Sequence, residues 1–246
     1  MDFSLIVPCF NEEQNIDKIF EEIQNNLGNY NYEIIFVDDK STDNSLSKLI
    51  KFSKNLNVSI LKNTINMGQS FSISKGINNS NSDTIITIDC DGQNNPKDIP
   101  KLYEIYKKNS NVDLVSGIRL NRKDNLIKKI SSKIANYIRN FIFNDKCTDT
   151  GCSLKVFNKN IFITFPYFDG IHRFIPSLFA GIKRKIIYVN VDHRSRIFGV
   201  SKYGTIGRLF KGIRDMIKVY RIIKNLNKIK LWLSIFQIFQ TLKLYS

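Results

Sequence analysis

Short apolar runs alternate with amphipathic stretches through the first half of the chain. The runs are rich in Ile, Val and Phe, which predicts buried strands at 3–7, 33–37, 58–61, 84–88 and 113–116. Between them, apolar residues recur every three or four positions, which predicts helices at 16–28, 46–52, 70–78 and 100–107. This alternation predicts an α/β domain with a mostly parallel sheet and helices on both faces. Ligands bind such sheets beyond the carboxyl ends of the strands, so residues that directly follow a strand are candidates for function.

The second half of the chain is basic and amphipathic. Residues 126–143 predict a basic amphipathic helix, and 145–157 and 185–193 predict a loop and a strand that return to the sheet. From residue 205 an apolar stripe runs beside a stripe of Lys and Arg. The uncharged stretch 231–242 that follows is well short of the roughly 20 residues needed to span a bilayer. We therefore expect a globular domain over 1–204 and, over 205–246, basic amphipathic helices that lie on a membrane surface.

The net charge of +15 conceals a division between the two halves. Residues 1–118 hold 11 Lys and Arg against 16 Asp and Glu, a balance of −5, whereas residues 119–246 hold 26 against 6, a balance of +20. This asymmetry predicts a polyanionic partner, either a nucleic acid, an anionic membrane surface or a phosphorylated ligand. The hydrophobic fraction of 42% excludes an intrinsically disordered chain.

The cysteines and the first residues predict an intracellular protein. Cys9, Cys90, Cys147 and Cys152 are too few for a disulfide framework and lack the paired spacing of a zinc site, so we expect reduced thiols in the cytosol. The first residues carry no basic segment and reach Pro8 after a short apolar run. We interpret them as a strand rather than a signal peptide.

Two acidic pairs stand where a ligand site is expected. Asp38 and Asp39 directly follow the strand 33–37, and Asp89 and Asp91 directly follow the strand 84–88. An Asp-x-Asp arrangement suits Mg²⁺ or Mn²⁺, which keep open positions for phosphate oxygens. A single acidic residue after a strand is more often a turn former or a helix cap. Two acidic pairs at the ends of predicted strands favour a metal site instead.

Six segments, in order along residues 3–204, carry a resemblance to a known family. They are Ile-Val-Pro-Cys-Phe-Asn-Glu-Glu from residue 6, Phe-Val-Asp-Asp-Lys-Ser-Thr-Asp from 36, Asn-Met-Gly-Gln from 66, Thr-Ile-Asp-Cys-Asp-Gly-Gln-Asn-Asn-Pro from 87, Asp-Thr-Gly-Cys-Ser-Leu-Lys-Val-Phe from 149, and His-Arg-Ser-Arg-Ile-Phe-Gly-Val-Ser-Lys-Tyr-Gly from 193. Together they resemble the inverting family 2 glycosyltransferases, in particular the polyprenol-phosphate sugar synthases of the dolichol-phosphate mannose synthase type. The resemblance implies a GT-A-like fold that binds a nucleotide sugar.

The resemblance implies a donor site at the ends of the first strands. The residues that match the pocket for the base and ribose are Pro8, Phe10, Glu12, Val37 and Asp39, with Asp39 placed to accept a hydrogen bond from the base. Asp89, Asp91 and Gln93 match the segment that holds Mg²⁺ or Mn²⁺ against the donor diphosphate, where the ion neutralises charge on the leaving group. Without the neighbouring motifs, Glu12 would be interpreted as an exposed acid in the first turn of a helix and Gln93 as a polar loop residue.

The resemblance also implies an acceptor site in the basic half. The residues that match its phosphate-binding positions are Arg119, Lys128, Ser132, Arg196, Ser201 and Lys202. Lys128 stands where an arginine is usual, which replaces a bidentate fork by a point charge. The segment 149–152 is expected to line the sugar or acceptor site, although it also fits an ordinary turn, and His172 is expected over the donor sugar. The residues expected to carry catalysis are Asp89, Asp91, Arg119, Arg196 and Lys202.

The implied reaction moves a sugar from a nucleoside-diphosphate sugar to a polyprenyl phosphate with inversion, at the cytoplasmic face of the membrane. The product is a lipid-linked sugar for an envelope glycan or for lipid modification. A lipid monophosphate is already charged at pH 7, so this acceptor requires electrostatic positioning more than a general base. The Gln-x-x-Arg-Trp motif of processive polysaccharide synthases is absent from the sequence, which argues against polymer synthesis.

Three alternatives remain open from the sequence. The first is a family 2 transferase that acts on a sugar hydroxyl of an envelope glycan, with Asp169 as the base. The second is a nucleic-acid-binding protein, which explains the basic half but requires no acidic pair at a strand end. The third is a noncatalytic membrane-surface scaffold, against which the intact acidic segments argue. The motifs favour the polyprenyl-phosphate reaction, with no nucleic acid involved.

Overall fold

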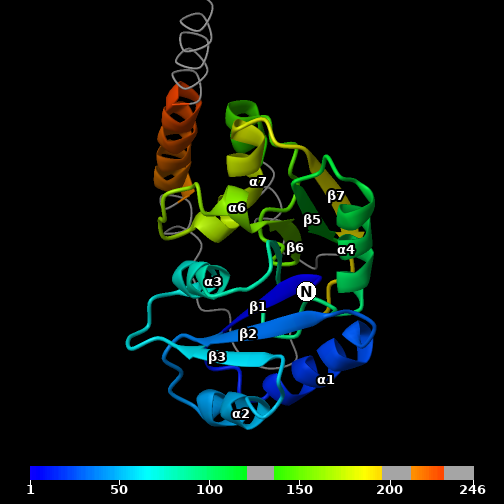
Figure 1. The fold of residues 1–246 in the computed structure, drawn as a ribbon. Coiled ribbons are helices and arrows are strands. Elements are labelled where there is room, and N and C mark those ends of the chain that lie inside the picture. Colours follow the sequence, from blue (N-terminus) through cyan, green and yellow to red (C-terminus); the bar gives the residue numbers. More distant parts are fainter. Residues whose placement is uncertain (121–135, 196–211, 230–246) are drawn as a thin grey trace, which may run out of the picture.

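The computed structural model describes residues 1–120, 136–195 and 212–229. Over these residues the chain forms a seven-stranded sheet with the order β3-β2-β1-β4-β6-β5-β7 (Figure 1). The strands are β1 (Phe3–Cys9), β2 (Tyr32–Asp38), β3 (Val58–Lys62), β4 (Thr84–Thr87), β5 (Leu114–Arg119), β6 (Lys155–Asn158) and β7 (Ile186–Val191). All neighbouring pairs are parallel except the two that involve β6. The predicted α/β fold with a mostly parallel sheet is confirmed.

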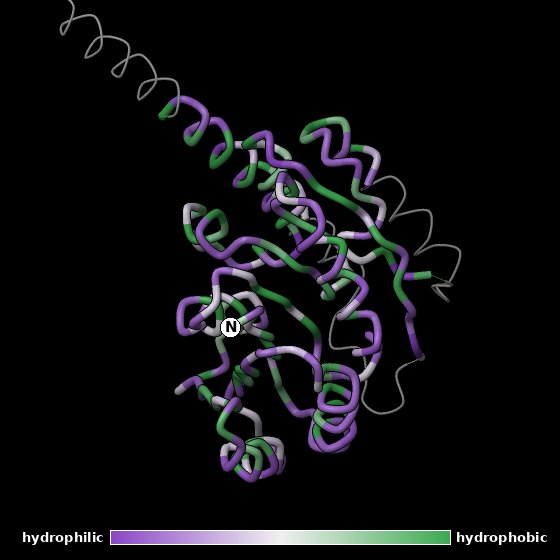
Figure 2. The backbone as a smooth tube through the Cα atoms, turned by 45° about the vertical axis from the view of Figure 1, so that its right-hand side comes forward, coloured by the Kyte–Doolittle hydropathy of each residue, from purple (hydrophilic) through white to green (hydrophobic). Residues whose placement is uncertain are grey.

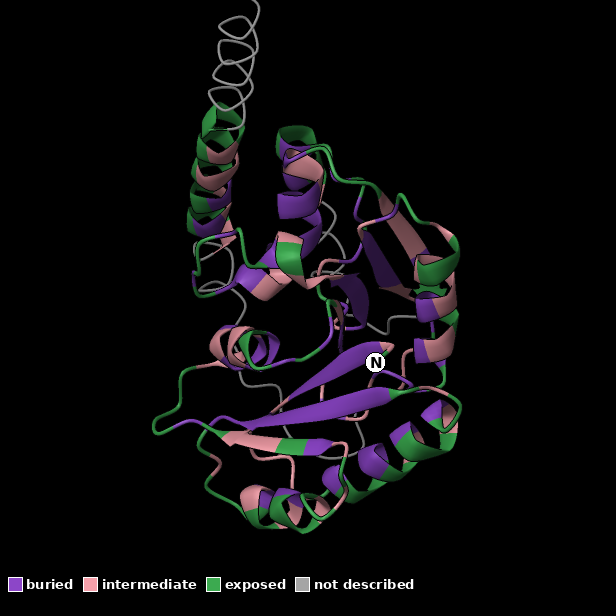
Figure 3. Cartoon of the chain, viewed as in Figure 1, coloured by how far each residue is buried: buried purple, intermediate pink, exposed green. Residues whose placement is uncertain are grey.

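The helices cover both faces of the sheet because the strand side chains alternate. Phe3, Leu5 and Val7 pack with α1, α2 and α4 on one face, whereas Ile6 and Ile35 pack with α3 and α7 on the other (Figures 1 and 3). The helices are α1 (Ile16–Leu27), α2 (Ser45–Phe52), α3 (Gln69–Asn78), α4 (Asp98–Lys108), α6 (Lys159–Phe162) and α7 (Ile171–Gly181), together with the helical stretches 136–143 and 212–229. The four helices predicted in the first half are confirmed to within two residues at each end.

Two features of the second half differ from the sequence pattern. α7 was not expected. Its buried apolar residues recur every three or four positions from Ile171 to Phe179, but Pro176 lies inside the segment and argues against a helix. β6 lies antiparallel between β4 and β5, with Lys155 opposite Thr87. This insertion brings the chain just before β6 against the end of β4. Of the predicted helix 126–143, residues 136–143 are helical and the remainder lies outside the described residues.

Helix 212–229 packs on the domain with one face. Val219 and Asp215 are fully buried, and Arg173 of α7 donates to Asp215 at 2.8 Å (Nη2 to Oδ2). The opposite side leaves Ile217 and Tyr220 about half exposed, and the helix alternates hydrophobic and hydrophilic residues along its length (Figure 2). The domain and tail assigned to 1–204 and 205–246 stay a prediction, since 196–211 and 230–246 lie outside the described residues. In the described part, no helix has the length and apolar character of a membrane span.

We expect Gly181→Ala to destabilise the protein by about 1–3 kcal/mol, because the new methyl group overpacks the contact between α7 and helix 212–229. A Cβ at Gly181 would lie 2.3 Å from Cδ1 and 2.8 Å from Cγ2 of Ile223. Urea denaturation measures the effect. Gly28→Ala is the control, since its Cβ would meet nothing closer than 3.8 Å. Equal midpoints for the two variants would contradict the docked position of the helix.

Candidate active site

The carboxyl ends of β1, β2 and β4 bring the predicted donor-site residues together. β1 lies between β2 and β4, and Pro8 pairs with Val37 across the parallel register. Asp39 follows directly, and its backbone N–H donates to the carbonyl of Cys9 at 2.8 Å. Pro8, Val37 and Asp39 therefore share one edge of the sheet, where Phe10 is half-buried.

Hydrogen bonds join the loops that follow β1 and β2. The backbone N–H of Glu12 donates to Ser45 Oγ at 2.9 Å, and Thr42 N donates to Asn11 Oδ1 at 2.8 Å. The Glu12 carboxylate accepts from Asn15 Nδ2 at 2.7 Å. These contacts explain why two of the recognised segments consist of small polar and acidic residues, because each loop satisfies the backbone of the other. They hold Glu12 beside the edge of the sheet at which the parallel strands end.

The Asp39 carboxylate organises the chain before α3. It is buried and accepts hydrogen bonds from Asn63 Nδ2 at 2.7 Å and from the backbone N–H groups of Met67 and Gly68 at 2.8 Å each. Gly68 has φ +84°, a conformation that glycine adopts at low cost. Asp39 thus holds the chain before α3 in place, and its predicted contact with the base stays a prediction.

Asp89 and Asp91 lie just beyond β4, as predicted, and both are held by neighbours. Gln69 Nε2 at the start of α3 donates to Asp89 Oδ1 at 2.6 Å, and the Asp89 backbone N–H donates to Ser153 Oγ at 3.1 Å. Asp91 is buried and accepts from the backbone N–H of Gln93 at 3.1 Å. The backbone carbonyl of Gln93 in turn accepts from Arg194 N at 2.8 Å, which ties this turn to the segment after β7.

The electrostatics of this acidic pair favour a cation. Burial, together with the neighbouring Asp91 carboxylate, raises the pKa of Asp89 to about 7, against the lowering effect of Ser153, Lys155 and Arg119. Mg²⁺ and Mn²⁺ commonly use one or two protein carboxylates and complete their shell with substrate phosphates. Among the described residues no group of three or more His, Cys, Asp or Glu side chains could enclose a metal. The oxygen donors of Asp89 and Asp91 therefore fit an ion that also binds a diphosphate.

Arg119, predicted for the acceptor, forms a partly buried ion pair with Asp149. Its Nε and Nη2 donate to the two oxygens of Asp149 at 2.7 Å each, and its backbone N–H donates to Oδ2 at 3.1 Å. Gly151 packs closely here, since a Cβ would lie 2.6 Å from Nη2 of Arg119 and would displace the guanidinium. Asp89 and Arg119 each shift the pKa of the other, so the guanidinium lies within electrostatic range of the acidic pair.

The structure does not describe the other predicted acceptor residues. Lys128, Ser132, Arg196, Ser201 and Lys202 lie outside the described residues. Arg194, in the same recognised segment as Arg196, donates from Nη1 to both carboxylate oxygens of Glu22 on α1 at 2.8 Å.

Sequence reasoning missed several residues that contact the site. Gln69 and Ser70 begin α3, Ser153 precedes β6, and the buried Lys155 lies within electrostatic range of Asp89. Gln69 is the last residue of the recognised Asn-Met-Gly-Gln segment, so the sequence could have indicated it as a site residue. Ser153 and Lys155 lie in the recognised segment from 149, but no role was assigned to them, because only the antiparallel insertion of β6 beside β4 places them near Asp89.

His172 and Asp169 stand at the start of α7, across from α3. Ser70 Oγ lies 2.7 Å from His172 Nδ1 and accepts from the backbone N–H of Gly170 at 2.7 Å. Asp169 is exposed. Burial, followed by Asp169 and Asp39, raises the pKa of Tyr167, which places this loop near the Asp39 side of the site. The predicted position of His172 over a donor sugar stays a prediction.

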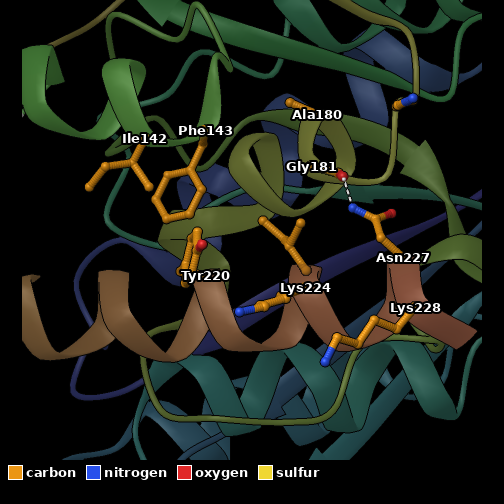
Figure 4. A pocket seen from close by; sticks show the side chains of 10 residues that line it. Ile142, Phe143, Ala180, Gly181, Tyr220, Lys224, Asn227 and Lys228 are labelled. Carbon is orange, nitrogen blue, oxygen red and sulfur yellow. Dashed lines mark hydrogen bonds between the residues drawn. The ribbon is translucent and has the colours of Figure 1, made fainter.

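A groove of about 630 Å³ lies apart from these residues, between helix 136–143, the end of α7 and helix 212–229 (Figure 4). Ile142 and Phe143 face Tyr220 and Lys224 across it, and Asn227 Nδ2 donates to the carbonyl of Gly181 at 3.0 Å. Its walls are apolar with lysines at the edge. No residue of the acidic pair or of the Arg119 ion pair lines it.

Comparisons with known proteins agree with this site. Residues 4–165 match the glycosyl transferase family 2 model. Dodecaprenyl-phosphate galacturonate synthase of Rhizobium johnstonii is 38% identical over 226 residues, which cover 89% of this chain and 66% of that protein, just under two thirds of its length. Two structures of glucosyl-3-phosphoglycerate synthase of Mycobacterium tuberculosis are similar in fold. The complex with Mn²⁺, UDP and glucosyl-3-phosphoglycerate has a TM-score of 0.67 at 15% identity, and covers 88% of this chain and 77% of that chain. The complex with Mg²⁺ and UDP has a TM-score of 0.66 at 15% identity and the same coverage.

The family model spans most of the sheet and both acidic pairs, and the fold matches a glycosyltransferase of GT-A type. The chain therefore belongs to glycosyl transferase family 2.

Proposed function

We propose that this protein transfers a sugar from a nucleoside-diphosphate sugar to a polyprenyl phosphate, with inversion at the anomeric carbon. The observation that carries the proposal is the guanidinium of Arg119, whose side chain is 14% exposed and lies within electrostatic range of Asp89. This arrangement offers a cationic site for a second phosphate next to a site for the donor diphosphate. The name of the Rhizobium relative, a dodecaprenyl-phosphate synthase, supports the same acceptor class.

The residues divide the work between the two substrates. Asp89 and Asp91, with Gln93, would hold Mg²⁺ or Mn²⁺, which supplies Lewis-acid neutralisation of the leaving diphosphate when bound. Pro8, Phe10, Glu12 and Val37, with the loop that Asp39 organises, form the nucleotide side. Arg119, with Lys128, Ser132, Arg196, Ser201 and Lys202, binds and orients the acceptor phosphate. The acceptor phosphate is anionic at pH 7, so its oxygen attacks the anomeric carbon without prior loss of a proton to the protein.

The donor is tested with a panel of nucleotide sugars. UDP-galacturonic acid, UDP-glucose and GDP-mannose, each radiolabelled in the sugar, are incubated with Mg²⁺ or Mn²⁺, a short-chain polyprenyl phosphate and a free glycan. We expect one of them to give an organic-soluble labelled product. Label that moves only to a free glycan hydroxyl would favour the alternative with Asp169 as the base, and the proposed acceptor would be wrong.

We also propose that helix 212–229 contacts the cytoplasmic face of the membrane as part of a peripheral protein. Ile213, Ile217 and Tyr220 are 45–51% exposed, and the neighbouring Arg214, Lys218 and Arg221 are exposed as well. An apolar strip beside a basic strip binds anionic lipid through apolar burial and charge attraction together.

Ile217→Glu is expected to weaken sedimentation with vesicles of phosphatidylserine and phosphatidylcholine by about tenfold, because a buried isoleucine contributes about 1.5–3 kcal/mol. Ile50→Glu is the matched control. Ile50 is 54% exposed and lies on α2, at the opposite end of the molecule from helix 212–229 (Figure 1). If both variants sedimented like the unmodified protein, this membrane contact would be wrong.

A further inference from the structure

Three consecutive residues at the start of α3 contact three separate parts of the site. Gly68 N donates to Asp39 Oδ2 at 2.8 Å, and Gln69 Nε2 donates to Asp89 Oδ1 at 2.6 Å. Ser70 Oγ lies 2.7 Å from His172 Nδ1. Ser70, which contacts the His172 imidazole, therefore directly follows Gln69, which contacts Asp89.

The hydrogen bonds of Ser70 determine which nitrogen of His172 carries the proton. Ser70 is fully buried, and its Oγ already accepts from the backbone N–H of Gly170 at 2.7 Å. In the described part of the chain, the acceptor within reach of the Ser70 hydroxyl proton is His172 Nδ1. A buried hydroxyl that leaves its proton unsatisfied is costly, so Ser70 donates and Nδ1 accepts. A neutral imidazole that accepts at Nδ1 carries its proton on Nε2.

The loop before α7 places this imidazole on the donor side of the site. Tyr167 packs edge-on against Phe71 of α3, with ring centroids 6.0 Å apart. Gly170 has φ +106°, which turns the chain into α7 directly after this contact. α3 therefore contacts Asp39, Asp89 and the start of α7, which places His172 on the side of the site where we expect the nucleotide sugar.

We propose that Ser70 is a positioning residue that holds His172 as an Nε2–H donor, and that His172 donates this hydrogen bond to an oxygen of the transferred sugar. The identity of the ligand rests on the proposed function. The tautomer is a property of the protein without ligand. Because Nδ1 accepts the hydrogen bond from Ser70, it is not available to act as a base. The role left to His172 is to donate from Nε2–H to the sugar.

The tautomer is measured by ¹⁵N NMR of the labelled full-length protein. The chain has two histidines, His172 and His193, so a His172→Gln sample identifies the signals. We expect the Nε2–H tautomer in the unmodified protein and a mixture of tautomers in Ser70→Ala. Ser72→Ala is the control for this measurement, since Ser72 is equally buried on α3 and its hydroxyl contacts Asn63 and Gly68 instead. An Nδ1–H tautomer, or no change in Ser70→Ala, would show that Ser70 does not position the imidazole.

The sugar contact is measured by calorimetry with UDP-galacturonic acid, UDP-glucose, GDP-mannose, UDP and GDP in the presence of Mn²⁺. His172→Ala should weaken binding of the nucleotide sugar by about three- to tenfold and leave binding of the matching nucleoside diphosphate unchanged, as the loss of one neutral hydrogen bond requires. His172→Gln, whose amide can supply a comparable N–H, should retain most of the affinity. Equal weakening of both ligands would refute the contact. If the unmodified protein bound none of these nucleotide sugars, the proposed function and the sugar contact would both be wrong, and the NMR result would still decide the role of Ser70.

Discussion

Asp91→Asn is expected to lower turnover by several hundredfold or more while the fold stays intact. The variant keeps the size of the side chain and its hydrogen bond from the backbone of Gln93, but it removes one of the two charges that Asp89 and Asp91 offer a divalent cation. A ligand that stabilises charge on the leaving group contributes several kcal/mol in the transition state. The measurement is kcat at saturating Mg²⁺ or Mn²⁺, with urea denaturation as the check on folding.

A second readout separates metal binding from other causes of inactivity. Mn²⁺ with UDP or GDP, whichever matches the donor that the panel selects, should raise the Tm of the unmodified protein. It should raise the Tm of Asp91→Asn much less, because only a ligand of the native state shifts the unfolding equilibrium. Asp83→Asn is the control, since Asp83 is exposed before β4 and away from the strand's carboxyl end. Near-normal turnover of Asp91→Asn would show that Asp91 is not a metal ligand.

The second large effect is expected at Arg119. Arg119→Ala should reduce kcat/KM for a polyprenyl phosphate by about ten- to hundredfold, while the affinity for the nucleotide sugar stays nearly unchanged. The reason is the loss of a charge-assisted contact to phosphate, worth about 1.5–3 kcal/mol. Arg196→Ala and Lys202→Ala should shift the same parameter in the same direction. Steady-state kinetics with each substrate varied in turn measures both values.

Arg119 also balances a buried charge, so folding must be controlled. Its removal leaves Asp149 without its bidentate partner, which destabilises a protein by about 3–5 kcal/mol. The double variant Arg119→Ala with Asp149→Asn removes both charges and should recover stability without recovering acceptor use. Full activity of this double variant on polyprenyl phosphate would show that Arg119 acts only as a structural partner of Asp149.

The first half of this fold follows from its sequence because its signals are local. Each strand is a short apolar run that the chain terminates with polar residues, and each helix has a clear amphipathic period. The two acidic pairs could be placed at one edge because parallel strands end together. α7 was missed although its apolar residues have a helical period, because Pro176 lies inside it. The antiparallel insertion of β6 depends on contacts between residues about 70 positions apart along the chain.

The candidate site was predictable in its acidic residues and less so in how they are held. Asp39 was expected to accept from a base, whereas the structure shows three hydrogen bonds to the chain before α3. Arg119 was expected at the acceptor, and its pairing with Asp149 has no local sequence signal, because the two residues are joined only by the fold. Tertiary contacts of this kind decide the orientation of a charged side chain, and sequence pattern does not contain them.

The central claim is that a bond forms between the anomeric carbon and an oxygen of the lipid phosphate. The most direct measurement is ³¹P NMR of a short-chain polyprenyl phosphate incubated with the nucleotide sugar selected by the panel and labelled with ¹³C at its anomeric carbon. The account predicts that the phosphomonoester signal is replaced by a phosphodiester signal coupled to the labelled carbon, with the anomeric configuration opposite to that of the donor. An unchanged phosphomonoester, with the labelled sugar attached to a hydroxyl group, would contradict it.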